Sequence, residues 1–293
     1  MLQDKSIGGR VFDAVNYTLL SIIAIVMILP FINVIAGSFT TVGELARKQF
    51  VLIPTIWSLD AYRFIFSTST IFKSLGVSVG VTFFGTLFSM LLTAFMAYGL
   101  SKPHLMGRRT LMFIVVFTML FSGGLIPSFL VVKEMGLIDS YASLVVPTAI
   151  NAFNLIIMRN FFQNLPDGLE ESAKIDGAGY WGIFTKIVLP LSMPAVATIS
   201  LFYAVTYWNT YLPAILYLND ASKWPVQVIL RQIVVLASGL AGDTTDLGDG
   251  FIMPPQQTIK MAVIVVATLP ILVVYPFLQK HFAKGALIGS IKG

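Results

Sequence analysis

QNLPDGLEESAKIDGAGYWGIFTKIVLPLSMP, residues 163–194, is a polar and charged stretch that lies between two long apolar segments. Pro166 suits the first turn of a helix, because the N–H that proline lacks has no partner there. Glu170 and Glu171 follow near the positive N-terminal end of that helix, which favours acidic side chains. The stretch therefore predicts a short helix at the point where this chain meets water.

Two glycines then interrupt the helical pattern of the same stretch. Gly177 and Gly179 are expected to end the first helix, since glycine adopts the backbone conformations that a helix end requires. A second short helix should follow and end near Pro190. Its apolar face would carry Trp181, Phe184 and Val188. Residues 163–192 therefore predict two short helices joined by a glycine turn.

The composition of the whole chain is that of a membrane protein. Of its 293 residues, 56% are hydrophobic and only 11% are charged, and the mean hydropathy is +0.84. Ordinary soluble domains have a smaller fraction of hydrophobic residues and a larger fraction of charged residues. The net charge of +5 would suit nucleic-acid binding, but the basic residues are scattered in loops between apolar runs, so no nucleic-acid partner is expected. Cysteine is absent, which excludes disulfides and thiolate metal sites.

Six charge-free stretches are each long enough to cross a lipid bilayer as a helix. We therefore expect an all-α, multi-pass membrane protein with six transmembrane helices. A shorter apolar run at 232–242 is expected to be an extracytoplasmic or re-entrant piece. The six stretches are Ala14–Gly43, Ser74–Ser101, Thr110–Val132, Ser140–Met158, Ile187–Asn219 and Met261–Gln279.

Positive charges near the spans predict the orientation of the chain. Six spans place both termini on one side, and Lys and Arg concentrate on the cytoplasmic side of short loops. Lys5 and Arg10 precede the first span, and Arg108 and Arg109 lie between the second and third. Both termini are therefore expected in the cytoplasm. The expected layout is a cytoplasmic N-terminus at 1–13, a transmembrane domain at 14–279, outer loops at about 41–70 and 217–259, a cytoplasmic loop at 163–192 and a cytoplasmic tail at 280–293.

The residues of the cytoplasmic loop carry a specific resemblance. Glu171-Ser172-Ala173, then Gly177, then Ile187-x-Leu189-Pro190 is similar in spacing and identity to the EAA loop of bacterial ABC importer permeases, with Ser172 in place of the usual first alanine. In that family the loop docks on the ATP-hydrolysing subunit. The resemblance implies that the coupling residues are Glu170, Glu171, Ser172, Ala173, Asp176, Gly177 and Ala178. The alternative is an ordinary amphipathic cytoplasmic loop.

The resemblance covers essentially the whole chain. GGLIP at 123–127, MRNFF at 158–162, Trp208-Asn209, YPFLQK at 275–280 and the end of the chain resemble the carbohydrate branch of these permeases, and most of all the second permease of importers for alginate and other complex saccharides. This implies the type I importer architecture in the bacterial cytoplasmic membrane, working by alternating access. The implied partners are a homologous second permease, two ATP-binding subunits that hold ATP and Mg, an extracytoplasmic solute-binding protein and a saccharide.

Aromatic and amide side chains in the fourth and fifth spans are candidates for the saccharide path. Sugars present C–H faces to aromatic rings and hydroxyls to hydrogen-bonding groups. Tyrosine and tryptophan at this depth are equally typical of an interfacial belt, and the two asparagines three residues apart could join helices instead. The candidates are Asn151, Asn154, Tyr203, Tyr207, Trp208, Asn209 and Tyr211.

Two further patterns concern the second and third spans. Ser74, Ser78, Thr82, Thr86, Ser89 and Thr93 recur on one helical face, and Gly76 and Gly80 add small residues. This face either lines the path or packs closely against other helices, with the hydroxyls bonded to their own backbone. The run FSGGLIP at 121–127 should break or bend the third span.

Several activities are excluded by what the sequence lacks. The chain has no G-x-x-x-x-G-K-[ST] motif with which to hold ATP phosphates, so we expect no enzyme activity and no cofactor of its own. His104 and His281 have no partners at metal-ligand spacing. An ion-coupled secondary transporter or a membrane scaffold is the alternative function. Secondary transporters usually carry ionisable residues inside their spans, and a scaffold would leave the EAA-like loop unexplained.

Overall fold

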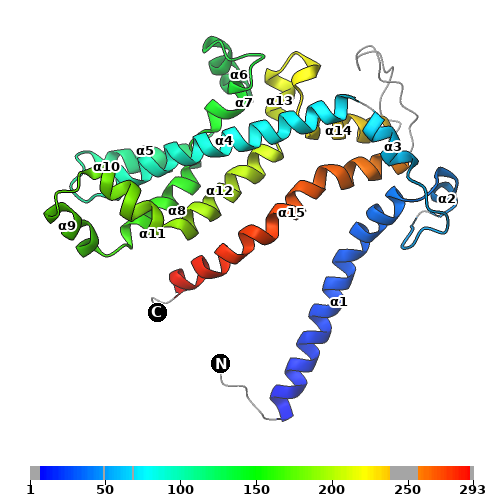
Figure 1. Cartoon of the computed structure of the whole chain (residues 1–293), viewed down its shortest axis with the longest axis horizontal. Coiled ribbons are helices and arrows are strands. Elements are labelled where there is room, and N and C mark those ends of the chain that lie inside the picture. The colour runs from blue at the N-terminus through cyan, green and yellow to red at the C-terminus, as the bar shows by residue number, and fades with distance from the viewer. Residues whose placement is uncertain (1–6, 49, 68, 238–256, 291–293) are drawn as a thin grey trace. The chain divides into compact units, whose positions relative to one another are not determined.

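A computed structural model describes residues 7–48, 50–67, 69–237 and 257–290, with only the backbone at residues 167, 236–237 and 274–290. The described residues are helical apart from turns and one isolated β-bridge between Thr40 and Trp57, which confirms the all-α prediction. Figure 1 shows the helices, which are α1 (Ile7–Ser38), α2 (Val42–Arg47), α3 (Asp60–Ser67), α4 (Ser69–Ser101), α5 (Arg108–Leu120), α6 (Leu125–Glu134), α7 (Ala142–Val145), η1 (Val146–Thr148), α8 (Ala152–Gln163), α9 (Asp167–Ile175), α10 (Tyr180–Ile183), η2 (Phe184–Val188), α11 (Leu189–Leu191), α12 (Met193–Trp208), α13 (Leu212–Tyr217), η3 (Ala221–Lys223), α14 (Val226–Ala237) and α15 (Gln257–Ser290).

The chain forms two compact units. Unit 1 consists of Met1–Ser69 and Leu230–Thr268, and unit 2 consists of Thr70–Ile229 and Leu269–Gly293. Parts of four predicted segments lie outside the described residues: 1–6 of the N-terminus, 49 and 68 of the first outer loop, 238–256 of the second outer loop and 291–293 of the tail. The rest of the predicted tail continues α15 as far as Ser290.

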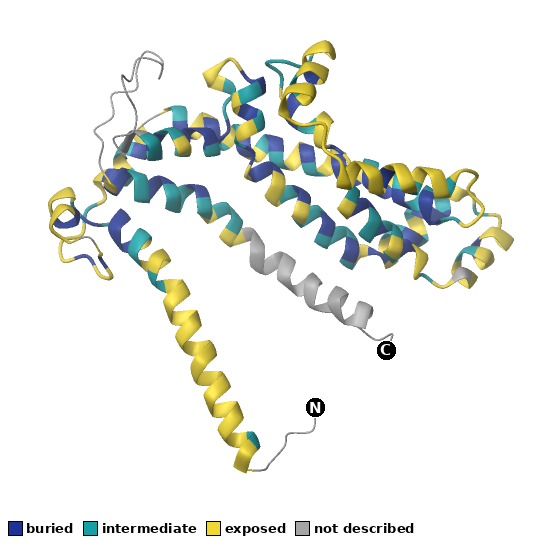
Figure 2. Cartoon of the chain, turned by 180° about the vertical axis from the view of Figure 1, so that it is seen from behind, coloured by how far each residue is buried: buried dark blue, intermediate teal, exposed yellow. Residues whose placement is uncertain are grey.

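Helix α1 of unit 1 packs against few of the described residues of its unit. It is long and apolar enough to cross a membrane, yet only 6% of its most apolar window is buried. Figure 2 shows its exposed surface along most of its length, with burial only near its C-terminal end. The first predicted span lies in this helix, but the helix begins at Ile7 and ends at Ser38 rather than at Gly43. Its apolar side chains are therefore available to lipid or to another subunit.

After α1, unit 1 is organised around one buried carboxylate. The Glu44 side chain, only 7% exposed, accepts hydrogen bonds from Thr40 Oγ1 at 2.8 Å, Lys48 Nζ at 3.0 Å, Thr55 N at 3.0 Å and Ile56 N at 3.1 Å. Hydrogen bonding by the side chains of Thr55, Lys48 and Thr40, in that order, and then by the Thr55 backbone holds the pKa of Glu44 well below its usual range. The carboxylate thereby joins α2 to the segment that follows it, and we call these five residues the Glu44 cluster.

Breaks divide three of the predicted spans. Helices α1 and α4 are each long and apolar enough to cross a membrane, and three further helix pairs qualify only as bent pairs. The bends are 120° between α5 and α6, 54° between η1 and α8, and 81° between α11 and α12. The described residues therefore give two to five spans by length and composition, rather than six continuous ones. The sixth predicted span lies in α15, whose described apolar part, Gln257–Val273, is shorter than a full span.

The first of these breaks confirms the prediction from FSGGLIP. Helix α5 ends at Leu120 and α6 begins at Leu125, with Gly124 in a positive-φ conformation (85°) that other residues rarely adopt. The other breaks were not predicted. The predicted fifth span, Ile187–Asn219, is interrupted at Ser192 and again between α12 and α13.

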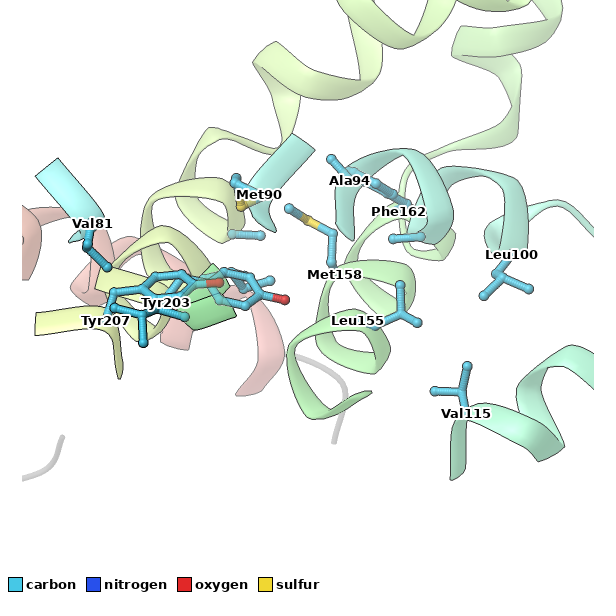
Figure 3. Packing of buried hydrophobic residues seen from close by; sticks show 14 of the residues in the cluster. Val81, Met90, Ala94, Leu100, Val115, Leu155, Met158, Phe162, Tyr203 and Tyr207 are labelled. Atoms are coloured by element: carbon cyan, nitrogen blue, oxygen red, sulfur yellow. The ribbon is translucent and has the colours of Figure 1, made fainter. Parts of the chain in front are cut away.

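The core of unit 2 lies among α4, α8 and α12. Figure 3 shows Leu155, Met158 and Phe162 of α8 packed with residues of α4, and Tyr203 beside Tyr207 on α12. The ring of Tyr207 lies so close to Gly85 that an added Cβ there would be 3.0 Å from it. Gly85 is therefore the close-packing glycine of α4. A Cβ at Gly76 or Gly80 would meet nothing within 4 Å among the described residues.

Three hydroxyls on the polar face of α4 bond to other helices. Ser89 Oγ and Tyr207 Oη are 2.6 Å apart, Thr93 Oγ1 and Tyr203 Oη are 2.6 Å apart, and Ser78 Oγ accepts from Val226 N at 2.8 Å. Close helix packing was one of the two predicted readings of this face. That interpretation expected the hydroxyls to bond to the backbone of their own helix, whereas these three bond to other helices.

Candidate functional site

The EAA-like loop, residues 163–192, begins with the predicted helix, α9. Its end has the geometry of a Schellman cap. Gly177 has φ of 80° and donates to Lys174 O at 3.0 Å, while Ala178 N donates to Ala173 O at 2.9 Å. Because only glycine adopts this φ without strain, Gly177 sets the angle between the two halves of the loop.

The second half of the loop is one helical segment with a local irregularity. It runs from α10 through the π-turn η2 to α11, and it ends at Leu191, near Pro190 as predicted. Phe184 and Val188 are buried, whereas Trp181 is exposed but stacks on Phe95 of α4 with ring centroids 5.7 Å apart. The predicted apolar face therefore packs against α4 of the same unit.

The predicted coupling residues separate into exposed and packed groups. Glu171, Ser172, Asp176 and Gly177 are exposed, and Ala178 is partly buried. Ala173 is buried in the core of unit 2. Glu170 is paired with Lys102 at the end of α4. Only the first group offers a surface to another protein.

Sequence reasoning missed two exposed apolar residues beside this acidic surface. Ile175 is 86% exposed at the end of α9, and Tyr180 is exposed at the start of α10. An isoleucine and a tyrosine flanking a glycine turn are the signal that could have identified them. Together with Glu171 and Asp176 they give the turn an apolar centre and acidic neighbours, a combination suited to a protein partner.

Four of the predicted path residues are brought together in unit 2. Asn151 is the N-cap of α8, and its Oδ1 accepts from Asn154 N at 3.1 Å. The Asn151 N–H donates to Tyr203 Oη at 3.0 Å, and the same hydroxyl bonds to Thr93. Tyr207 lies one turn further along α12, and its hydroxyl bonds to Ser89. The hydroxyls of both tyrosines are thus used inside this chain.

The remaining three candidates lie apart from that network. Asn209 is exposed, and its Nδ2 donates to Val205 O at 2.9 Å, so it closes the end of α12. Tyr211 is partly buried just before α13. Trp208 is buried and lines a cavity. The seven candidates therefore do not form one continuous surface.

The cavity that Trp208 lines has a volume of about 1100 Å³ and lies within unit 2, among α4, α12, part of the EAA-like loop and Pro270 and Ile271. Its wall is almost entirely apolar. The hydroxyls of Thr82 and Thr86 are buried without a hydrogen-bond partner among the described residues, and both residues line it. No cation lines this cavity, and no three His, Asp or Glu side chains gather as a metal site in the described parts of the chain.

Comparison with known proteins now places these features in a family. Residues 73–287 match the family described as binding-protein-dependent transport system inner membrane component. A polygalacturonan/rhamnogalacturonan transport system permease protein of Bacillus subtilis, YtcP, is 68% identical over 97% of this chain and 99% of its own length. Protein LplC of the same organism is 55% identical over 98% of this chain and 96% of its own length. These matches confirm the resemblance that the EAA-like loop indicated.

A solved structure agrees with the sequence relatives. One chain of a bacterial ABC transporter involved in the import of the acidic polysaccharide alginate is 34% identical to this chain, with a TM-score of 0.85. The similarity covers 94% of this chain and 98% of that chain. The helical arrangement described above is therefore that of an importer permease.

Proposed function

Because this chain belongs to the family of inner membrane components of binding-protein-dependent transport systems, we propose that its cargo is an oligosaccharide rich in uronic acids, of the polygalacturonan type. It is a permease subunit of an ABC importer for oligo- or polysaccharides. The similarity to YtcP, 68% over nearly the whole of both chains, carries the cargo proposal. Alginate, the cargo of the structural relative, is also a polyuronate, and it is the second candidate.

The remaining subunits of the transporter follow from the family. A homologous second permease would complete the path, two ATP-binding subunits would hold ATP and Mg, and an extracytoplasmic binding protein would deliver the saccharide. In this assembly the chain has six spans in the cytoplasmic membrane and both termini in the cytoplasm. The bent pairs α5/α6, η1/α8 and α11/α12 each count as one span, and α1, α4 and α15 supply the others.

The EAA-like loop is the contact with an ATP-binding subunit in this proposal. Glu171, Ser172, Asp176, Gly177 and Ala178 supply the docking surface, while Glu170 and Ala173 hold the loop to its own chain. Binding of ATP closes the two ATPase subunits, displaces the loop and turns the path outward. Hydrolysis resets the path toward the cytoplasm.

We propose that this subunit lines the transport path with a surface that binds the saccharide only weakly, so that the chain can slide along it. Trp208 and the apolar cavity wall suit the C–H faces of sugars, and Asn151, Asn209 and Tyr211 add polar groups at accessible positions. Asn154, Tyr203 and Tyr207 are buried and support these positions from behind. The described residues of the cavity wall include no cation with which to hold a carboxylate, so the partner permease is expected to supply much of the specificity for acid groups.

An uptake panel tests the cargo. The complete transporter, with both permeases, both ATPase subunits and the binding protein, is reconstituted into vesicles and offered oligogalacturonides, oligomannuronates and neutral arabino-oligosaccharides of matched length. We expect ATP-driven uptake to be fastest for oligogalacturonides and slowest for the neutral chains. Fastest uptake of the neutral chains would refute the acidic cargo, and fastest uptake of oligomannuronates would replace it with alginate.

A further inference from the structure

Lys102 lies just beyond the C-terminal end of α4 and makes an ion pair that connects two distant parts of the sequence. Its Nζ donates to both carboxylate oxygens of Glu170 in α9. The side chains are only 27% and 16% exposed, and Nζ also lies 4.2 Å from the centre of the Tyr98 ring. An exposed ion pair contributes little, but partial exclusion of water strengthens a bidentate, charge-assisted contact of this kind.

Aromatic side chains attach the second half of the EAA-like loop to the same end of α4. The ring of Phe184 lies 5.3 Å from that of Phe95 and 5.0 Å from that of Tyr98, measured between centroids. Trp181 also stacks on Phe95. The loop is therefore held to α4 on both sides of its glycine turn, once by charge and once by ring packing.

Helix α8 also holds this end of α4. Arg159 Nε donates to Leu100 O and Gln163 Nε2 donates to Ser101 O, both at 3.3 Å. These are carbonyls of the last turn, which have no partner within the helix. The C-terminal end of α4 is thus the point at which α8 and both halves of the loop meet, at the same end of unit 2 in Figure 1.

The other residues of α4 lead into the transport path. The helix continues without a break for 33 residues, and its hydroxyls bond to Tyr203 and Tyr207 of α12. Thr86, one to two turns from those contacts, lines the cavity. An unbroken helix fixed at one end to the loop and bonded along its length to the path can carry a displacement between them as a rigid element.

We propose that the Lys102–Glu170 ion pair is the positioning contact through which the EAA-like loop moves α4. This inference rests on the proposed function, since it requires an ATPase that displaces the loop. It assigns the two neighbouring glutamates different tasks. Glu170 faces inward and fastens the loop to α4, while Glu171 faces outward to the partner.

Charge reversal tests this assignment in the complete reconstituted transporter. Lys102→Glu and Glu170→Lys each place like charges together, and the double variant restores an opposite pair. We expect each single variant to retain binding-protein-stimulated ATPase while the amount of saccharide taken up per ATP hydrolysed falls on the order of tenfold. The double variant should recover to within about twofold of wild type, because the pair itself and not either residue carries the effect.

The controls separate this proposal from a purely structural role and from failure of the proposed function. Arg63→Glu disrupts an exposed ion pair with Asp60 at 3.5 Å and should leave uptake per ATP unchanged. Unchanged uptake per ATP in both single variants would overturn the proposal, and so would equal damage in the single and double variants. If a single variant assembles poorly, uptake per ATP in the double variant remains the test: its recovery supports the proposal, and its failure to recover overturns it. Failure of the wild-type chain to co-purify with an ATPase would refute the proposed function instead.

Discussion

Gly177→Val is expected to remove most ATP-driven uptake while the protein still inserts and assembles. Gly177 has φ of 80°, and no atom of the described residues lies within 4 Å of an added Cβ, so the obstacle is the backbone conformation and not a lack of space. Forcing a β-branched residue into this region costs about 1–2 kcal/mol. The loop avoids that cost by abandoning the Schellman cap, which changes the angle at which Glu171 and Asp176 are presented.

We expect uptake per assembled complex to fall on the order of tenfold or more. The contact between the EAA-like loop and the ATP-binding subunit requires one geometry of the loop, and the valine variant no longer adopts it. The matched control is Gly177→Asn, because asparagine tolerates positive φ better than any other residue that carries a Cβ. Uptake by the asparagine variant should stay near that of wild type. Equal uptake by the valine variant and wild type would show that the loop does not transmit the motion.

Glu44→Ala is expected to release the segment that follows α2 in unit 1. The substitution leaves the amides of Thr55 and Ile56 and the hydroxyl of Thr40 without their acceptor in a largely buried setting. Hydrogen exchange at the two amides should accelerate on the order of 10- to 100-fold, the effect expected for unsatisfied buried donors. Asp60→Asn is the control, since that side chain is 81% exposed, and it should leave both amides protected.

The same cluster has a defined pH response. A carboxylate whose pKa is lowered on folding stabilises the folded state fully above its unfolded pKa, which is about 4.3 for glutamate. That contribution declines only as the pH falls from there through the lower, folded pKa. Protection of the Thr55 and Ile56 amides should therefore be constant above about pH 5. Loss of protection between pH 7 and pH 5 would contradict the described cluster.

Local patterns in the sequence predicted much of the EAA-like loop. Pro166, Gly177 and Pro190 mark its helices because each acts on its own backbone, and the glycines of FSGGLIP marked the break after α5 for the same reason. The start of helix α2 also has a local sequence signal, although this helix was not predicted. Thr41-x-x-Glu44 is a helix-start pattern, and Thr41 Oγ1 does accept from Glu44 N at 3.4 Å.

Other features depend on contacts that no local pattern encodes. Lys102 lies in the same short loop as Arg108 and Arg109, whose positive charges predicted only the orientation of the chain; its ion pair was not predicted, because Glu170 lies 68 residues away. The spacing of Ser89 and Thr93 showed a polar face but could not show that two tyrosines more than 100 residues later would meet it. The length of an uncharged stretch also does not reveal the bends at Asn151 and Ser192, because a straight helix and a broken one can be formed by equally apolar sequences.

Labelling of two single cysteines tests the central claim. This claim is that the EAA-like loop lies on the cytoplasmic side of the membrane, where the ATPase binds, and that the loop at about 217–259 lies on the outer side. The chain contains no cysteine, so Ser172→Cys and Ser222→Cys each introduce one unique and exposed thiol. In intact cells, a membrane-impermeant reagent should label the thiol at position 222 at once and the thiol at position 172 only after the membrane is opened. Labelling of position 172 from outside, with position 222 protected, would contradict the orientation and the coupling mechanism built on it.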